Sequence, residues 1–216
     1  MTRPSPADLL VLHAVRLRGM ADNPAVARRF GLDRAATDEL LGDFEAYGWI
    51  TRSGFAGIAG WSLTDRGRAE NERRLAAELR EVPGADATLR RVHRAFLPLN
   101  DRLQRACTDW QIRPAAGDAL AVNDHRDPAW DGRVLDELVA LAGALSPLVR
   151  ELAGALDRFR GYDTRFAAAL GRARAGEPSW VDRSGADSCH TVWFELHEDL
   201  IATLGLRRGA EGFPVP

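Results

Sequence analysis

The sequence predicts a mainly α-helical protein whose helices are interrupted by a two-stranded β-hairpin. Apolar residues recur at three- and four-residue spacing along most of the 216 residues, which is the period of amphipathic helices. Two short runs, Trp49–Ser53 and Ile58–Leu63, are instead typical of strands, and the glycine-containing tip Gly54–Gly57 can join them. From Ala85 onward almost no strand pattern remains, so we expect the rest of the chain to be all-α.

The composition is that of a globular protein. The chain is 45% hydrophobic and has a net charge of −2, so it has enough apolar residues for a core. No run approaches the length of a transmembrane helix, and the N-terminus lacks the apolar core of a signal peptide. The two cysteines are too few for a disulfide framework. We therefore expect a cytoplasmic protein with no membrane partner.

Capping residues divide the first third of the chain into helices. The first predicted helix runs from Pro6 to Arg18, and His13 lies among its apolar positions, where a hydrogen-bonded core histidine is commoner than a ligand. The second begins at Asn23, a favoured N-cap, and ends at Gly31.

Two further caps set the remaining helices of this region. Asp33 can cap the third helix, which ends at Gly48. Thr64 can cap the helix that follows the predicted hairpin, Asp65–Glu81, whose polar sequence suits a connector.

These segments, in this order, resemble the winged helix-turn-helix of bacterial transcription regulators, closest in style to MarR-type repressors. The resemblance is carried by the helix–Gly31-Leu32–helix turn, by Tyr47–Ile50 entering the hairpin, and by Leu63–Arg68 leaving it. It covers roughly the first third of the chain. It implies a DNA-binding domain over residues 1–82 and a dimeric, ligand-responsive repressor bound to a double-stranded DNA operator.

In this docking geometry, the first turns of the recognition helix reach base edges. Arg34 could donate two hydrogen bonds to a guanine, and Thr37 could contact a thymine methyl or a phosphate. Asp38 could accept a hydrogen bond from cytosine or simply pair with Arg34. Arg52 suits a narrow minor groove. The candidate DNA-binding residues are Arg28, Arg29, Arg34, Thr37, Asp38, Arg52, Arg66 and Arg68. Alternatively, Arg34 and Thr37 could be ordinary surface residues. Arg28 and Arg29 could be present only because cations are favoured near a helix C-terminus.

The charge of this region favours a second interpretation. Nucleic-acid-binding domains are often basic, yet residues 1–82 hold 12 arginines against 12 acidic residues. The alternative function is therefore a winged-helix protein-interaction module, with a helical domain that binds a partner or a small molecule.

The remaining chain predicts a second, all-α domain over residues 83–208, for dimerisation or ligand sensing, and a flexible tail over 209–216. Its helices are expected at Ala85–Ile112, with a kink at Pro98, and at Trp130–Phe159, either continuous or restarted at Ser146-Pro147. Two more are expected at Asp163–Arg174 and Ser188–Leu204.

Histidines and aromatic residues gather at Asn123–Asp127 and Cys189–His197. In the last helix His190, Trp193, Phe194 and His197 share one face by spacing, so we expect them to point inward. One interpretation is structural, with the histidines bonded to loop backbone or to Asp124 and Asp127. A second is a small-molecule pocket. Its candidate residues are Trp110, Asp124, His125, Trp130, His190, Trp193, Phe194 and His197.

A metal site is the third interpretation. Seven residues of helix rise by roughly 10 Å, so His190 and His197 can hardly share one metal, because metal–nitrogen bonds are only about 2 Å long. One of these two histidines could bind a metal together with His125 and with Asp124 or Asp127.

No catalytic signature is present. The chain lacks Gly-x-Ser-x-Gly, a P-loop, Gly-x-Gly-x-x-Gly and His-Glu-x-x-His. Cys107 lies in a helix interior and suits a small apolar role better than a nucleophile. We therefore expect neither enzymatic activity nor a cofactor.

Overall fold

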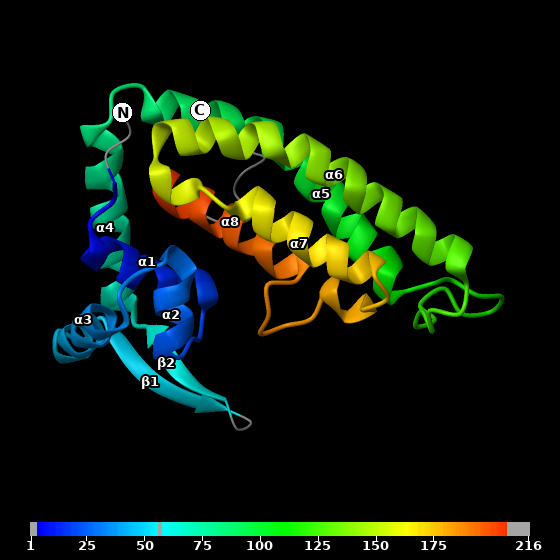
Figure 1. Cartoon of the computed structure of the whole chain (residues 1–216), viewed down its shortest axis with the longest axis horizontal. Coiled ribbons are helices and arrows are strands. Elements are labelled where there is room, and N and C mark those ends of the chain that lie inside the picture. Colours follow the sequence, from blue (N-terminus) through cyan, green and yellow to red (C-terminus); the bar gives the residue numbers. More distant parts are fainter. Residues whose placement is uncertain (1–3, 56–57, 207–216) are drawn as a thin grey trace. The chain divides into compact units, whose positions relative to one another are not determined.

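The computed structural model of the chain describes residues 4–55 and 58–206 (Figure 1). This part of the chain is mainly helical, with eight α-helices, two short 3₁₀ helices and one two-stranded antiparallel sheet. The mainly α fold class predicted from the sequence is therefore confirmed. The predicted tail, residues 209–216, and the tip residues Ala56 and Gly57 lie outside the described residues.

The chain divides into two compact units. Unit 1 takes in Met1–Ala87, Ala155–Arg158 and His197–Pro216, and unit 2 takes in Thr88–Gly154 and Phe159–Leu196. The sequence instead predicts one boundary, between residues 82 and 83. The difference has a physical cause described below: buried charges at Arg158 and Asp199 find their partners in the N-terminal helices.

Unit 1 begins with α1 (Ala7–Arg18), α2 (Asn23–Phe30) and α3 (Arg34–Ala46). The N-cap of α2 is Asp22, whose carboxylate accepts the Ala25 N–H at 2.8 Å, so the predicted cap is one residue off. Asp33 caps α3 as predicted, accepting the Ala36 N–H at 2.9 Å. Thus local side-chain oxygens fix the start of both helices.

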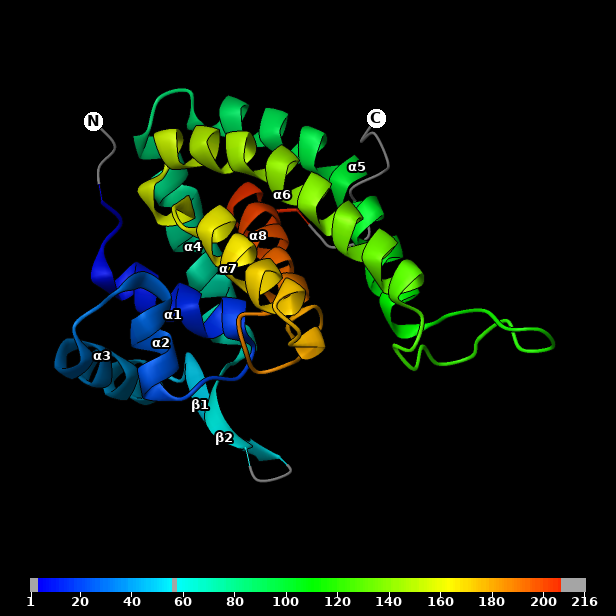
Figure 2. The same ribbon diagram turned by 45° about the vertical axis from the view of Figure 1, so that its right-hand side comes forward.

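The hairpin follows, with β1 (Ile50–Phe55) and β2 (Ile58–Leu63) antiparallel and Ile50 opposite Leu63 (Figures 1 and 2). It extends away from the three helices, and Trp61 at its base is buried. The backbone of Trp61 exchanges two hydrogen bonds with Ala21, at 2.8 and 3.2 Å. A Cβ at Gly60 would lie 2.8 Å from the Ala21 backbone, so this close approach requires glycine.

Helix α4 (Asp65–Glu81) leaves the hairpin with Thr64 as its N-cap, as predicted. The core of unit 1 joins α1, α2, α3 and the hairpin. Its large buried side chains are Val11, Leu12, Val15, Val26, Leu41, Phe44, Ile50 and Trp61. This core fixes the turn between α2 and α3 and the base of the hairpin as one body.

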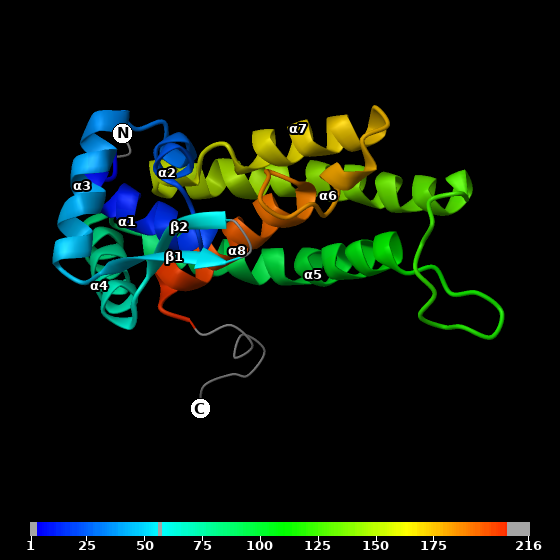
Figure 3. The same ribbon diagram turned by 90° about the horizontal axis from the view of Figure 1, so that it is seen from below.

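Unit 2 is built from most of α5 (Ala85–Gln111), from α6 (Pro128–Ala155) and α7 (Tyr162–Arg174), and from the first half of α8 (Cys189–Leu204). The short helices η1 (Asp157–Phe159) and η2 (Pro178–Trp180) lie in the connections. Helices α5 and α6 run side by side (Figure 3). Helix α6 continues through Pro147, so a restart at Ser146-Pro147 does not occur.

An aromatic cluster forms the centre of unit 2. Trp193 of α8 lies against Phe96 of α5, with ring centroids 4.9 Å apart, and against Phe166 of α7 at 5.6 Å. Its indole N–H donates to Asn100 at 3.2 Å. A buried indole thus has both its apolar surface and its polar atom satisfied.

Helix α6 is long and apolar enough to cross a membrane when only length and composition are considered, and 33% of its most apolar window is buried within the protein. The expectation that no run approaches such a length was therefore wrong. The buried residues of α6 repeat every three or four positions, as Val134, Leu138, Leu141, Leu145, Val149 and Leu152 do. That spacing is also the pattern of a helix packed into a core.

Candidate functional site

Unit 1 presents four arginines that carry no ion pair with any residue the structure describes. Arg28 lies in the last turn of α2, Arg34 begins α3, Arg52 lies on β1, and Arg66 lies in the first turn of α4. All four side chains are exposed. They are the part of the predicted DNA-binding set that is available to a partner.

Three members of that set are placed differently. Arg29 is buried, with its guanidinium 4.4 Å from the Phe30 ring centroid. Thr37 is only 1% exposed, and its hydroxyl donates to the Asp33 carbonyl at 2.7 Å. Arg68 lies 4.0 Å from Glu198. Arg29 and Thr37 are thus buried in this conformation, unlike the exposed members of the set.

Asp38 does not hold Arg34. Its carboxylate accepts the Asn23 side-chain N–H at 2.7 Å, and the Asn23 oxygen accepts the Trp61 indole N–H, also at 2.7 Å. The Arg52 guanidinium lies over the Trp61 ring, 4.7 Å from its centroid. This chain of contacts joins α2, α3 and the hairpin, and so sets the angle at which the hairpin leaves the helices.

The solvent-facing side of α3 is acidic beyond its first turn. Arg34 is its one basic residue, whereas Asp38, Glu39, Asp43 and Glu45 are all exposed. A polyanion is therefore attracted to the start of α3 and repelled by the rest of it.

A buried charge cluster lies inside unit 1, and residue spacing in the sequence does not predict it. Asp199 of α8 is fully buried and pairs with the Arg158 guanidinium and with His13, whose Nε2 lies 3.0 Å away. Arg158 also donates to Glu78 of α4 at 2.9 Å and to Thr203 at 2.6 Å. These bonds attach η1 and the end of α8 to α1 and α4.

Burial sets the charge states of this cluster. Burial lowers the pKa of His13 by more than the Asp199 carboxylate raises it, so the imidazole is neutral. Burial raises the pKa of Asp199, but Arg158 and His13 more than offset this and hold it well below its usual value. The neutral ring donates from Nε2 to Asp199. Its Nδ1 lies 3.3 Å from the side-chain oxygen of Asn71.

Because of this cluster, we expect unit 1 to lose stability in acid. Because the pKa of folded His13 lies below its ordinary value of 6.5, the unfolded chain binds more protons near and below that pH. The free energy of unfolding should therefore fall as the pH drops through about 6.5, whereas the contribution of Asp199 is lost only in stronger acid. Urea unfolding measured between pH 5 and 7.5 should show this slope.

The control for this prediction uses two substitutions. His13→Gln should remove the slope near pH 6.5, even though it lowers the stability throughout. His190→Gln, at an exposed histidine, should leave the slope in place. Equal slopes in the wild type and His13→Gln would contradict the prediction.

The predicted ligand-pocket residues are only partly brought together. Trp110 and His125 line a cavity of about 370 Å³ in unit 2. Trp193 belongs instead to the aromatic core, and the Trp130 indole donates to the Asp109 carbonyl at 2.6 Å. Asp124 is exposed and accepts the Arg126 N–H.

Four residues of α8 were predicted to point inward, and the prediction is wrong for two of them. His190 is exposed and Phe194 is 45% exposed, whereas Trp193 and His197 are buried. The buried side of the helix is centred on other positions, namely Cys189, Val192, Trp193, Leu196 and Leu200. The helix is therefore rotated relative to our expectation, and His190 cannot belong to a buried ligand set.

His125 is held in one orientation by its surroundings. It has a positive φ of 57°, which is uncommon for a residue other than glycine. Its ring lies against Trp110, with centroids 4.6 Å apart, and its Nδ1 lies 3.0 Å from Asp131. The buried Asn123 accepts the His125 backbone N–H at 3.2 Å and donates to Asp131 at 2.8 Å. The loop, the ring and the carboxylate thus form a fixed arrangement.

Neither a metal nor a thiol nucleophile is favoured. Among residues 4–55 and 58–206 no group of three or more His, Cys, Asp or Glu could hold a metal ion. Burial, together with the Asp182 charge, raises the pKa of the Cys107 thiol to about 12. Burial likewise raises the pKa of Cys189 to about 12. Both thiols therefore stay protonated at neutral pH.

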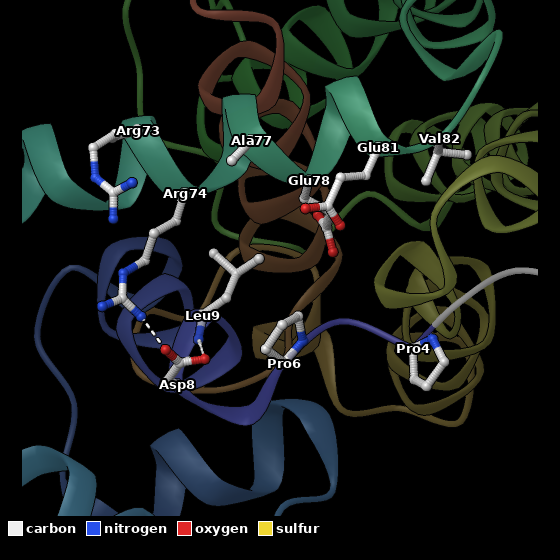
Figure 4. Close-up of a pocket in the computed structure, with 10 residues that line it drawn as sticks. All are labelled: Pro4, Pro6, Asp8, Leu9, Arg73, Arg74, Ala77, Glu78, Glu81 and Val82. Carbon is white, nitrogen blue, oxygen red and sulfur yellow. Dashed lines mark hydrogen bonds and ion pairs between the residues drawn. The ribbon is translucent and has the colours of Figure 1, made fainter.

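A second cavity, of about 340 Å³, lies in unit 1 between the start of α1 and helix α4 (Figure 4). Arg74 on its wall pairs with Asp8, and Glu78 is committed to Arg158. The carboxylates of Glu78 and Glu81 lie close together at the other end of the cavity (Figure 4). Arg74, Asp8 and Glu78 on the cavity wall therefore already take part in ion pairs that stabilise unit 1.

The chain was compared with protein-family models, curated proteins and solved structures, and no match was found in any of the three comparisons.

Proposed function

We propose that unit 1 is a winged helix-turn-helix module that binds duplex DNA. The observation that carries this proposal is a set of exposed arginines that form no ion pair with the described residues. They lie at the turn between α2 and α3 and on the elements around it, namely Arg28, Arg34, Arg52 and Arg66. The order of three helices, hairpin and helix is the one that such modules use. In this proposal the protein is a dimeric transcription regulator, and unit 2 contributes dimerisation or ligand sensing.

The acidic side of α3 restricts how DNA is contacted. Arg34, in the first turn, would meet a base edge or a phosphate, and Arg52 would follow the hairpin into a minor groove. Asp43 and Glu45, two to three turns further on, would have to stay clear of the phosphates. The proposal therefore requires the helix to approach the duplex by its N-terminal end.

The test is a binding titration of the full chain on duplex DNA from its own promoter, at two salt concentrations. Arg34→Ala should weaken specific binding by about 1–3 kcal/mol and relax the preference at one base pair, since a base contact is lost. Arg52→Ala should weaken binding to all sequences and reduce the salt slope by about 1. Arg80→Ala, an exposed arginine at the far end of α4, is the control and should change neither.

A second candidate function, a protein-docking module, is favoured by the acidic side of α3 itself. Tyr47, directly after that helix, is 52% exposed and lies against Trp49, with ring centroids 4.8 Å apart. Acidic residues around an exposed aromatic ring suit a basic protein surface.

One double substitution separates the two functions. Asp43→Asn with Glu45→Gln should strengthen DNA binding, because it removes repulsion from phosphates. It should weaken docking of a basic protein. If the wild-type protein shows no salt-dependent binding to DNA and the Arg34 and Arg52 variants behave like it, the DNA proposal fails.

A further inference from the structure

The cavity beside His125 offers a ligand one carboxylate and several other hydrogen-bond acceptors. It lies where the end of α5, the loop before α6 and the segment around η2 meet. Its lining residues are Trp110, Gln111, Val122, Asn123, His125, Pro178, Ser179 and Asp182. The walls contributed by Trp110, Val122 and Pro178 are apolar, so the remaining side chains decide the polarity of a ligand.

His125 contributes an acceptor. The Asp131 carboxylate can only accept a hydrogen bond, so Nδ1, which lies 3.0 Å from it, carries the proton of the neutral ring. Nε2 then carries a lone pair. It has no hydrogen-bond partner among the residues that the structure describes. The Trp110 ring and the buried Asn123 keep the imidazole in this orientation.

Asp182 contributes the charge. One oxygen of its carboxylate accepts the Gln111 side-chain N–H at 2.8 Å, and none of the residues that the structure describes bonds to the other oxygen. Because the Gln111 nitrogen donates to Asp182, its own oxygen is a further acceptor at this wall. Asn123 offers no donor, since its N–H groups go to the Trp110 carbonyl at 3.0 Å and to Asp131 at 2.8 Å. The side-chain donors left among the lining residues are the Ser179 hydroxyl, the second N–H of Gln111 and the Trp110 indole N–H.

We propose that this cavity binds a small organic cation, an amine or amidinium group on a flat apolar body, whose N–H groups bond to Asp182 and to Nε2 of His125. The cation neutralises the carboxylate, and its body covers the apolar walls. A cavity of about 370 Å³ suits a ligand of one or two rings. The inference does not depend on DNA binding, because it rests on unit 2 alone.

The test measures direct binding to the full chain, without DNA, by isothermal titration calorimetry. The probes are benzamidine, 2-phenylethylamine and tryptamine, with benzoate and benzamide as the anionic and neutral counterparts. At least one cation should bind saturably, about tenfold or more tightly than benzoate and benzamide, because a charge-assisted hydrogen bond is lost in each counterpart.

Substitutions locate the site. Asp182→Asn keeps the side-chain size and should weaken binding of that cation about tenfold or more, and His125→Ala should weaken it further. Ser179→Trp, at an exposed position on the wall, should block the cavity without disturbing buried packing. His190→Gln, which does not line the cavity, should bind like the wild type. Circular dichroism confirms the fold of each variant.

Three results would overturn the inference. They are no saturable binding by any of the cations, binding of benzoate as tight as that of the cations, and an unchanged affinity in both Asp182→Asn and Ser179→Trp. None of them bears on the DNA-binding proposal, whose test uses other residues and another ligand.

Discussion

Replacing Asp199 with asparagine is expected to destabilise unit 1 by about 3–5 kcal/mol, because it leaves the buried Arg158 guanidinium without its main counter-charge. Glu78 still pairs with Arg158, but His13 and Thr203 then face an amide in place of a carboxylate. Urea unfolding measures the loss. Hydrogen exchange should locate it in α1, in α4 and at the end of α8, which the cluster joins.

Two further variants show whether the loss comes from a buried charge. Glu177→Gln breaks the exposed Arg172–Glu177 pair and should cost far less stability than Asp199→Asn, because solvent screens an exposed ion pair. The double variant Arg158→Met with Asp199→Leu should be more stable than the sum of its single substitutions predicts, since each single substitution leaves the other member of the buried Arg158–Asp199 pair without its partner. A loss in Asp199→Asn no larger than that in Glu177→Gln would contradict the prediction.

Gly67→Ala is expected to be nearly as damaging. A Cβ at this position, in the first turn of α4, would lie 1.8 Å from the Trp49 carbonyl oxygen, a backbone atom that cannot rotate away. Either α4 or the start of β1 must shift, at a cost of about 3 kcal/mol or more. The same shift would disturb the Thr64 hydroxyl, which donates to the Gly48 carbonyl at 2.7 Å. Thermal unfolding measures the effect.

Gly42→Ala is the matched control, because Gly42 lies inside α3 and a Cβ there would meet nothing within 4 Å. Alanine is the better helix former, so this variant should gain up to about 1 kcal/mol of stability. Opposite signs for the two glycines would show that the close approach to Trp49 causes the loss. Wild-type stability in Gly67→Ala would show that the junction can relax.

Some of the candidate DNA-binding side chains lie differently from what their spacing predicted, and these differences have a common cause. Helical spacing placed Arg34, Thr37 and Asp38 on one face, but spacing does not tell which way a side chain turns. The Thr37 hydroxyl bonds the Asp33 carbonyl, and Asp38 bonds Asn23, because polar groups near a helix start satisfy one another first. The exposure of Arg28, Arg34, Arg52 and Arg66 required the packed structure.

The sequence by itself determined the elements. Asp33, Thr64, Gly31 and Gly48 mark helix ends through contacts within a few residues, so their effect can be read locally. The mainly α class and the hairpin follow from the same short-range signals. Helix α4 and β2 have the bounds that the sequence predicted.

Only the tertiary structure decided which distant polar residues meet. His13, Arg158 and Asp199 form one buried cluster although His13 and Asp199 lie 186 positions apart in the sequence. Likewise, Gln111 meets Asp182 across 71 residues at the cavity wall. Hydrophobic spacing predicts that a helix has a buried side, but the rotation of the helix and the partners of its polar groups depend on packing against elements far away in the chain. For that reason α8, whose spacing suggested one row of inward histidines, instead buries Asp199 and His197 and exposes His190.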